Sequence, residues 1–185
     1  VCEQLHLPFQ AGSNKILKRM NRKYTKEEYL NKILKAKKEI PGVALSTDVI
    51  VGFPGETDED FEETLDVLKR VEFDQVFMFI YSKRIGTSAA EMEDTATYED
   101  KHRNFERLVK LQNEISKKLN DAYMDRCVEV LAEGNSKNDP LKYTGRTRTG
   151  KVVNFTGVEG IIGKLVNVKI NEIHSWFLNG EIYMS

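Results

Sequence analysis

The sequence is short of cysteine and of net charge, and each shortage excludes a class of protein. Its two cysteines, Cys2 and Cys127, lie far apart and do not have the spacing of metal ligands. They argue against a disulfide framework and against a metal site made by this chain alone, and they fit a reducing cytoplasm. Because the formal net charge is −1, any nucleic acid has to be bound by local basic patches.

Other familiar signatures are also missing. We expect neither a membrane span nor a signal peptide, because no apolar run is long enough for a bilayer. The sequence contains no GxxxxGK[ST] loop, no dinucleotide-binding glycine fingerprint, no HExxH and no GxSxG. Since the chain begins without methionine and runs directly into a strand-like segment, we expect it to be part of a longer protein.

The first two thirds of the chain and the last third follow different patterns. Residues 1–124 alternate strand-like and helix-like segments, whereas residues 125–185 contain only short β-type runs. This change predicts two domains, an α/β domain over 1–124 and an all-β domain over 125–185. The predicted strands of the first domain are residues 4–10, 43–52 and 75–81.

Helix-start signals follow these strands. Asn14 is expected to cap a first helix, and Thr25 with Glu28 and Thr57 with Asp60 have the spacing of capping boxes. A long amphipathic helix is expected from Thr97 onward. Three strand-helix units do not close a barrel, so the pattern predicts half of one or an open sheet.

The last third predicts a small closed β-barrel of the OB-like kind. Five short runs are separated by Asn, Asp, Pro and Gly turns, which is typical of such barrels. The runs are residues 126–133, 143–150, 151–155, 164–170 and 176–184.

The carboxyl ends of the predicted parallel strands suggest a ligand site, because such ends open at one mouth. The stretch STDVIVGFPGET (46–57) ends its strand at a glycine-rich turn, where backbone can approach a ligand. Asp48 lies inside this apolar strand, and a carboxylate there needs a partner or a ligand. A salt bridge to a lysine of a neighbouring helix is an equal alternative.

Two basic clusters are candidates for RNA binding. KILKRMNRK (15–23) follows the first strand, and GRTRTGK (145–151) alternates cations with small residues, which predicts that Arg146, Arg148 and Lys151 share one strand face. Phe155, His174 and Trp176 could add stacking surfaces. A solvated strand face is the alternative, and His6, His102 and His174, isolated in sequence, are expected to be structural or surface residues.

Three long blocks resemble a known family. LHLPFQAGSNKILKRMNRKYT (5–25), ALSTDVIVGFPGETDEDFEETL (44–65) and FIYSKRIGTSAAEMED (79–94) resemble the methylthiotransferases of the radical S-adenosylmethionine superfamily. The last third resembles the TRAM domain, which is associated with RNA binding. The resemblance implies the C-terminal half of a partial (βα)6 TIM-like barrel, strands four to six, followed by the TRAM barrel.

The resemblance also implies a reaction. In the family, a [4Fe-4S] cluster held by CxxxCxxC receives an electron from a reductant and reduces S-adenosylmethionine to a radical that activates the substrate. A second [4Fe-4S] cluster supplies sulfur. This sequence has no CxxxCxxC, so we expect no metal ligand and no catalytic residue in this chain, which should be inactive by itself.

Specific residues take roles only through this resemblance. It implies contacts to S-adenosylmethionine from Gln10, Ser13, Asp48, Ile50, Gly52 and Arg84. It implies RNA contacts from Lys18, Arg19, Arg22, Lys23, Arg146, Arg148, Lys151, Phe155 and Trp176. Ala11 departs from the serine that is common in the family, which weakens any role for that position.

The expected partner is the anticodon stem-loop of a cytoplasmic tRNA, with no DNA and no membrane. The closest resemblance is to family members that add a 2-methylthio group to N6-isopentenyladenosine. Three alternatives remain: a threonylcarbamoyl adenosine in tRNA, an aspartate of a ribosomal protein, and a noncatalytic RNA-binding module.

Overall fold

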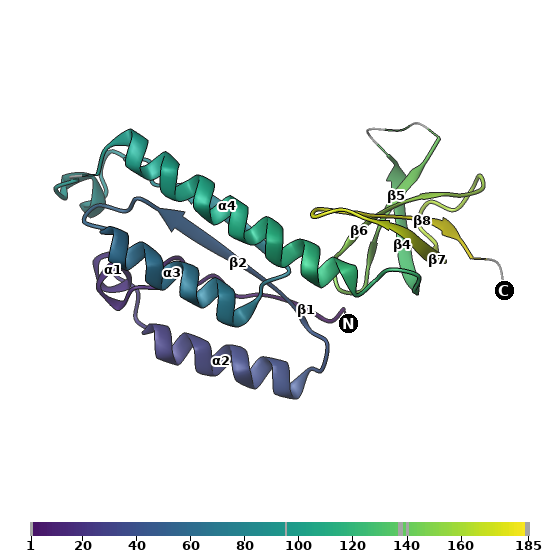
Figure 1. The fold of residues 1–185 in the computed structure, drawn as a ribbon, viewed down its shortest axis with the longest axis horizontal. Helices are drawn as coiled ribbons and strands as arrows, with labels where there is room; N and C mark the ends of the chain where they lie inside the picture. The colour runs from purple at the N-terminus through teal and green to yellow at the C-terminus, as the bar shows by residue number, and fades with distance from the viewer. Residues whose placement is uncertain (1, 95, 137–138, 140, 184–185) are drawn as a thin grey trace. The chain divides into compact units, whose positions relative to one another are not determined.

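The computed structural model describes residues 2–94, 96–136, 139 and 141–183. The chain divides into two compact units, one formed by Leu5–Ile115 and one formed by Val1–Gln4 with Ser116–Ser185 (Figure 1). The elements are β1 (Gln4–His6), α1 (Asn14–Arg19), α2 (Lys26–Glu39), β2 (Ala44–Val51), α3 (Asp58–Val71), β3 (Gln75–Ile80), the 3-10 turn η1 (Ser88–Glu91), α4 (Tyr98–Asp121), β4 (Cys127–Asn135), β5 (Tyr143–Thr147), β6 (Val152–Thr156), β7 (Leu165–Ile173) and β8 (Leu178–Ile182).

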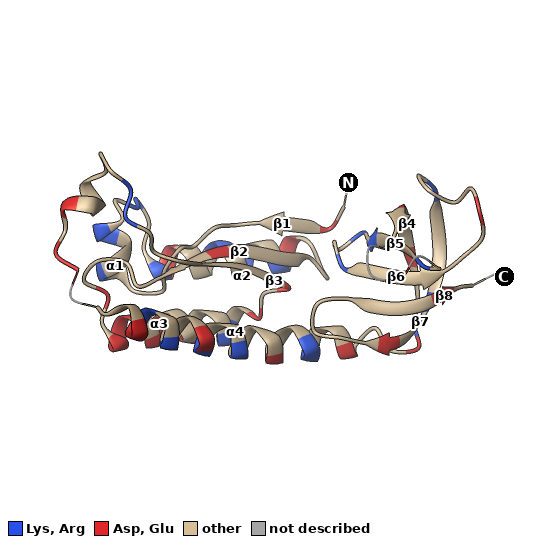
Figure 2. Ribbon diagram, turned by 90° about the horizontal axis from the view of Figure 1, so that it is seen from above, with Lys and Arg blue, Asp and Glu red and all other residues tan. Residues whose placement is uncertain are grey.

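The α/β unit is built on a three-stranded sheet in the order β1-β2-β3. β2 and β3 are parallel, with Ser46 opposite Gln75 and Val51 opposite Ile80. The first strand is shorter than predicted, because after β1 only Gln10 returns to pair with Val49 of β2. Helix α3 and the first part of α4 lie along one side of this sheet (Figure 2). The open three-stranded sheet agrees with the predicted half-barrel.

Three of the four predicted helix starts are confirmed, including Thr97, which directly precedes α4 and accepts a hydrogen bond from the Asp100 backbone N–H at 3.1 Å. Thr25 caps α2 and Thr57 caps α3, each in a reciprocal capping box with the acidic residue three positions later. The prediction for Asn14 is wrong, because α1 begins at Asn14 after Ser13, whose side chain makes no capping bond. The Asn14 side chain instead accepts a hydrogen bond from the Lys26 backbone N–H at 2.7 Å. Asn14 therefore joins α1 to the start of α2.

The core of the α/β unit lies between the sheet and its helices. Phe61 and Leu68 of α3 are fully buried, as the helical spacing of apolar residues in this segment predicts. Phe9 stacks on Phe73 with ring centroids 5.8 Å apart. The contact between Phe9 and Phe73 holds the residue before Gln10 against the segment that leads into β3.

The second unit contains a closed barrel in the order β4-β5-β6-β8-β7. Its core is formed by buried side chains from four of the five strands and from the loop before β7: Val130, Ala132, Val153, Phe155, Ile161, Val168, Ile170 and Leu178. Tyr143 of β5 is partly buried against this core. Gly145 passes so close to β4 that a Cβ there would lie 2.2 Å from the Leu131 carbonyl oxygen. The predicted small barrel is confirmed. In the described parts of the chain, no helix is long and apolar enough to cross a membrane.

Candidate ligand site and basic surfaces

The carboxyl ends of β2 and β3 border a cavity of about 490 Å³. Its volume lies within the range of about 300–1,000 Å³ that is usual for small-molecule sites. Four residues predicted to contact a cofactor line it: Gln10, Asp48, Ile50 and Arg84. The other lining residues are Phe53, Phe79, Ile80, Tyr81, Ser82, Thr87 and Ala89. The structure therefore brings together two-thirds of the predicted cofactor residues in one mostly apolar cavity.

Gln10 is held in an unusual backbone conformation at this cavity. Its φ angle is +70°, a left-handed conformation that is uncommon for residues other than glycine. The conformation is fixed by two backbone hydrogen bonds of 2.9 Å, one from Gln10 N–H to the Asp48 carbonyl and one from Ile50 N–H to the Gln10 carbonyl. Strain of this kind is often found at ligand sites.

Asp48 is paired with a histidine from the neighbouring strand. His6 Nε2 lies 3.6 Å from the Asp48 carboxylate, and His6 Nδ1 lies 3.0 Å from the Ser46 hydroxyl. The sequence alternative of a lysine partner is therefore wrong, because β1 places His6 there instead. The Asp48 side chain is 29% exposed, so its carboxylate remains accessible from the cavity that it lines.

Tyr81 has a buried hydroxyl without a hydrogen-bond partner among the described residues. The Tyr81 ring makes an edge contact with Phe53, with the two ring centroids 5.2 Å apart. The Lys101 ammonium group lies 5.6 Å from the centroid of the Tyr81 ring. A buried hydroxyl without a partner is costly. Tyr81 as a residue belongs to the lining of the cavity, while its hydroxyl is buried away from solvent.

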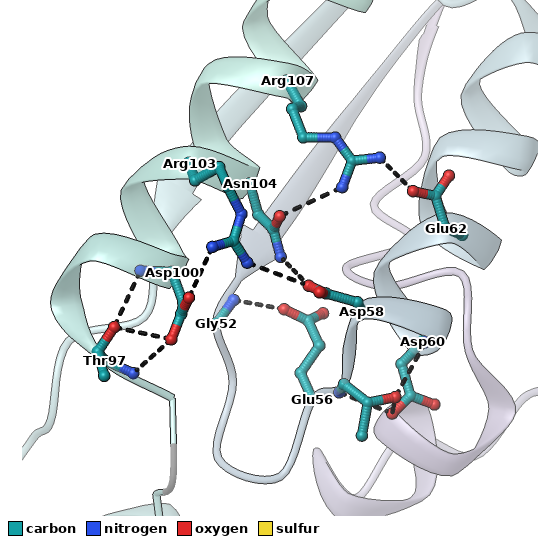
Figure 3. Close-up of polar contacts among 11 residues, drawn as sticks. Gly52, Glu56, Asp58, Asp60, Glu62, Thr97, Asp100, Arg103, Asn104 and Arg107 are labelled. Carbon is teal, nitrogen blue, oxygen red and sulfur yellow. Dashed lines mark hydrogen bonds and ion pairs between the residues drawn. The ribbon is translucent and has the colours of Figure 1, made fainter.

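The turn after β2 is closed by Glu56. Its carboxylate accepts a hydrogen bond of 2.5 Å from the backbone N–H of Gly52 (Figure 3), and Gly52 has a φ of +73°. Burial raises the pKa of Glu56 to about 7, although the Gly52 N–H favours the charged form. The turn that carries Phe53 into the cavity wall is thus held by a carboxyl group that titrates near neutral pH.

Polar contacts between α3 and α4 support the turn that joins β2 to α3. Arg103 and Asn104 of α4 both bind the Asp58 carboxylate, and Arg107 binds Glu62 one turn further along (Figure 3). The network is local to the α/β unit and fixes the first turn of α3, which directly follows Glu56.

Two predicted cofactor residues lie away from the cavity. The Ser13 hydroxyl is buried and donates to Asp60 at 2.6 Å, in a cluster completed by Lys15. Burial alone would raise the pKa of Asp60, but hydrogen bonds from Lys15 and Ser13 lower it overall. Gly52 is covered by the side chain of Lys101, since a Cβ there would lie 2.5 Å from the Lys101 Cγ. These two residues hold the turn and do not line the cavity, so their cofactor contacts stay predictions.

A second cavity, of about 410 Å³, lies between α1 and α2. It is lined by three of the four cations predicted there for RNA binding, Lys18, Arg22 and Lys23. Lys and Arg are coloured blue around α1 in Figure 2. The fourth, Arg19, instead donates to the Pro54 carbonyl oxygen at 2.8 Å. Its guanidinium is occupied in holding the glycine-rich turn, which the sequence pattern did not predict.

On the barrel, the two arginines predicted to bind RNA are exposed and ion-paired. Arg146 lies 3.4 Å from Glu133. Arg148 lies in the turn after β5 and binds Glu3 through two hydrogen bonds of 2.9 and 3.0 Å. RNA phosphates would have to compete with these carboxylates for the guanidinium groups.

The predictions for Lys151 and Phe155 are wrong. Lys151 is 9% exposed, so it does not share an exposed strand face with Arg146, because the chain turns between them. Phe155 is fully buried in the barrel core and offers no stacking surface. Trp176, by contrast, is 51% exposed, and nearby His174 stacks on Phe177 at 4.3 Å.

Sequence reasoning missed Phe53, which lines the cavity, and His6, which pairs with Asp48. Alternation along β1 and β2 could have placed His6 beside Asp48, since parallel neighbours send matching side chains to one face. Phe53 was recognised only as part of the turn after its strand. Its contact with Tyr81 depends on the parallel pairing of β2 with β3, which no local pattern predicts.

The described residues contain no cluster of three or more potential metal-ligating side chains. Cys2 and Cys127 are free and exposed. The donor set of this chain therefore does not fit an iron-sulfur cluster, which needs several converging thiolates.

Comparison with known families defines the class of this protein. The family described as "Radical SAM superfamily" matches residues 2–68, and the family described as "TRAM domain" matches residues 123–183. The solved structure of the coproporphyrinogen III oxidase HemN from Escherichia coli, described as a radical SAM enzyme, aligns with a TM-score of 0.53 at 14% identity, over 91% of this chain and 41% of that chain. The chain thus carries part of a radical SAM domain followed by a TRAM domain.

Within this class, the chain is similar to a particular group of enzymes. It is 58% identical over 182 residues to the tRNA-2-methylthio-N(6)-dimethylallyladenosine synthase of Acetivibrio thermocellus. It is 59% identical to the enzymes of the same name from Clostridium botulinum strain Okra and Thermoanaerobacter sp.. These alignments cover 98% of this chain, and the chain spans 38–40% of the length of these relatives. The resemblance to the methylthiotransferases is confirmed.

Proposed function

We propose that this chain is part of a tRNA methylthiotransferase that converts N6-isopentenyladenosine beside the anticodon to its 2-methylthio derivative. The observation that carries the proposal is the identity of 58–59% with synthases of this modification over nearly the whole chain. The cavity at the ends of β2 and β3 supports it, because a nucleoside-sized ligand needs apolar walls with a few polar groups.

The residues of this cavity fit S-adenosylmethionine, which when bound supplies the radical chemistry that activates carbon 2 of the adenine. Ile50 and Phe79 provide apolar surface for an adenine ring. Asp48 offers a carboxylate to ribose hydroxyls or to the methionine ammonium group. The Tyr81 ring adds to the wall, and Arg84 can bind a carboxylate.

The iron-sulfur clusters of such an enzyme do not fit the thiols of this chain. We infer that their ligands belong to other parts of the complete protein, and that the 185-residue chain is inactive by itself. The reductant that supplies an electron to these clusters is then a partner of the complete enzyme. The two free, exposed cysteines support a cytoplasmic location, where thiols stay reduced.

The proposed RNA partner is the anticodon stem-loop of tRNA. It is supported by the match of residues 123–183 to the TRAM domain and by the exposed Arg146, Arg148 and Trp176 on the barrel. Guanidinium groups can bind phosphates, and an exposed indole can stack on an unpaired base.

Nucleoside mass spectrometry of total tRNA tests the function. Cells that lack the gene should contain isopentenyladenosine without its 2-methylthio group, and a plasmid with the complete reading frame should restore the group. A plasmid carrying Asp48→Ala should restore less. If the nucleoside is unchanged in the deletion, the substrate assignment is wrong, and the threonylcarbamoyl nucleoside and the ribosomal aspartate are then measured in the same cells. Loss of any of these modifications excludes a purely RNA-binding module.

A further inference from the structure

The basic cavity between α1 and α2 is built from a short stretch of chain. Lys18 comes from the last turn of α1, and Arg22 and Lys23 come from the connection to α2. Tyr24, Asn14, Thr25 and Glu28 complete the lining. Three cations therefore surround a hollow that contains a single acidic side chain.

That acidic side chain is already engaged. Glu28 accepts a hydrogen bond from the Thr25 backbone N–H at 2.9 Å as part of the capping box of α2. Neither Lys18 nor Arg22 forms an ion pair within the described residues, and Lys23 binds only the neutral side chain of Asn21. The cations of this cavity thus keep most of their charge available for an anion, unlike Arg146 and Arg148 of the barrel.

The cavity has one firm wall. The Tyr24 hydroxyl donates to the Phe9 carbonyl oxygen at 3.1 Å, and its ring lies 6.4 Å from that of Tyr29. Burial raises the pKa of Tyr24, and the nearby positive charge of Arg22 opposes that rise. Because Phe9 precedes Gln10, the same wall that shapes the basic cavity also fixes the segment leading into the cavity at the ends of β2 and β3.

We propose that this cavity is a binding site for one backbone phosphate of the RNA substrate, held by Lys18 and Arg22 with Lys23 at its rim. The proposal rests on the proposed function, since it takes tRNA as the partner. RNA backbone is favoured over a free anion because the three cations lie on an exposed hollow and because a phosphodiester needs positive charge without base-specific groups. Arg19 is not part of this site, because it binds Pro54.

The test is the salt dependence of tRNA binding by the complete enzyme. Lys18→Ala with Arg22→Ala should make the plot of log affinity against log salt shallower by about one, the value for one lost phosphate contact. Lys35→Ala with Lys38→Ala is the matched control. It removes the same charge from exposed positions of α2 and should leave the slope within error of the unmodified enzyme.

The outcomes separate this site from the function itself. Equal slopes for the two double variants, with strong tRNA binding by the unmodified enzyme, overturn the phosphate site and leave the function standing. No specific tRNA binding by the unmodified enzyme overturns both. In a parallel titration with inorganic phosphate, loss of phosphate binding in Lys18→Ala with Arg22→Ala, with an unchanged RNA slope, assigns the cavity to a free anion and also overturns the proposal.

Discussion

Apolar side chains have opposite roles in the two units of this protein. In the α/β unit, Phe77 and Phe79 of β3 are 42% and 53% exposed, and Phe79 lines the cavity at the strand ends. In the barrel, Phe155 of β6 is fully buried. The difference follows from closure, because a closed barrel encloses one face of every strand, whereas a three-stranded sheet leaves one face open.

This contrast also explains where each unit can bind a ligand. The α/β unit offers an apolar hollow with a few polar groups, as a small molecule requires. The barrel has filled its interior with side chains, so only its outer surface, with Arg146 and Trp176, is available to a partner. An apolar residue is thus a ligand contact in one unit and a core residue in the other.

The largest predicted effect tests this contrast with two identical substitutions. Phe155→Ala should lower the free energy of unfolding of the barrel by about 3–5 kcal/mol, as expected for a buried phenylalanine. Phe79→Ala should lower that of the α/β unit by less than about 1 kcal/mol, since half of the ring is exposed. The barrel is followed by the fluorescence of Trp176, the only tryptophan of the sequence, and the α/β unit by helical circular dichroism.

In a binding assay, Phe79→Ala should have the larger effect of the two variants. In the complete enzyme, Phe79→Ala should weaken binding of S-adenosylmethionine, measured by calorimetry, because it removes part of the cavity wall. The contrast between the units fails if Phe79→Ala destabilises as strongly as Phe155→Ala, which would show that the open face of the sheet is covered.

The next largest effect is a pH response of opposite sign in the two units. Glu56 has a pKa of about 7 in the folded α/β unit against 4.5 for an unperturbed glutamate. Between these values the unfolded chain has released the proton that the folded chain keeps, so stability falls as pH rises from about 4.5 to 7. In the barrel unit, a hydrogen bond from Arg148 lowers the pKa of Glu3, so that carboxylate contributes stability above its unfolded pKa and loses it as pH falls.

Glu56→Gln should remove the part of the stability that falls as pH rises. Relative to this variant, the unmodified chain should lose about 2 kcal/mol of stability between pH 5 and pH 8, measured by urea unfolding with helical circular dichroism. Groups common to both proteins cancel in the difference. An identical pH profile for the two proteins would show that Glu56 is not protonated in the folded α/β unit near pH 6.

Local signals in the sequence predict the elements well and the site only in part. The capping boxes at Thr25 and Thr57 were found correctly, because each depends on residues three positions apart. Asn14 was predicted to cap α1. Its side-chain amide oxygen instead accepts a hydrogen bond from the first residue of α2. A polar residue near a helix start carries no local mark of which helix it serves.

Roles that depend on tertiary structure were less predictable. Strand alternation placed Arg146 outside correctly but could not show that the chain turns at Arg148 and buries Lys151. Phe155 was taken as a surface residue because it is aromatic and near cations, although closure of the barrel buries it. Asp48 was recognised as unusual from its apolar surroundings, but its partner His6 is 42 positions away in sequence and is brought near only by the pairing of β1 with β2.

The smallest predicted effect is on the salt dependence of tRNA binding when ion-paired cations are removed instead of unpaired ones. Arg146→Gln with Arg148→Gln should make the salt dependence of tRNA binding shallower by less than Lys18→Ala with Arg22→Ala does. The reason is that Arg146 and Arg148 already lie against Glu133 and Glu3, so a phosphate gains less when it replaces a carboxylate than when it meets an unpaired cation. The free energy of unfolding should fall by less than about 1 kcal/mol, since exposed ion pairs such as Arg148 with Glu3 contribute little. A larger loss of slope from the barrel variant would mean that RNA displaces both carboxylates completely, and the barrel would then be the main electrostatic contact of the protein.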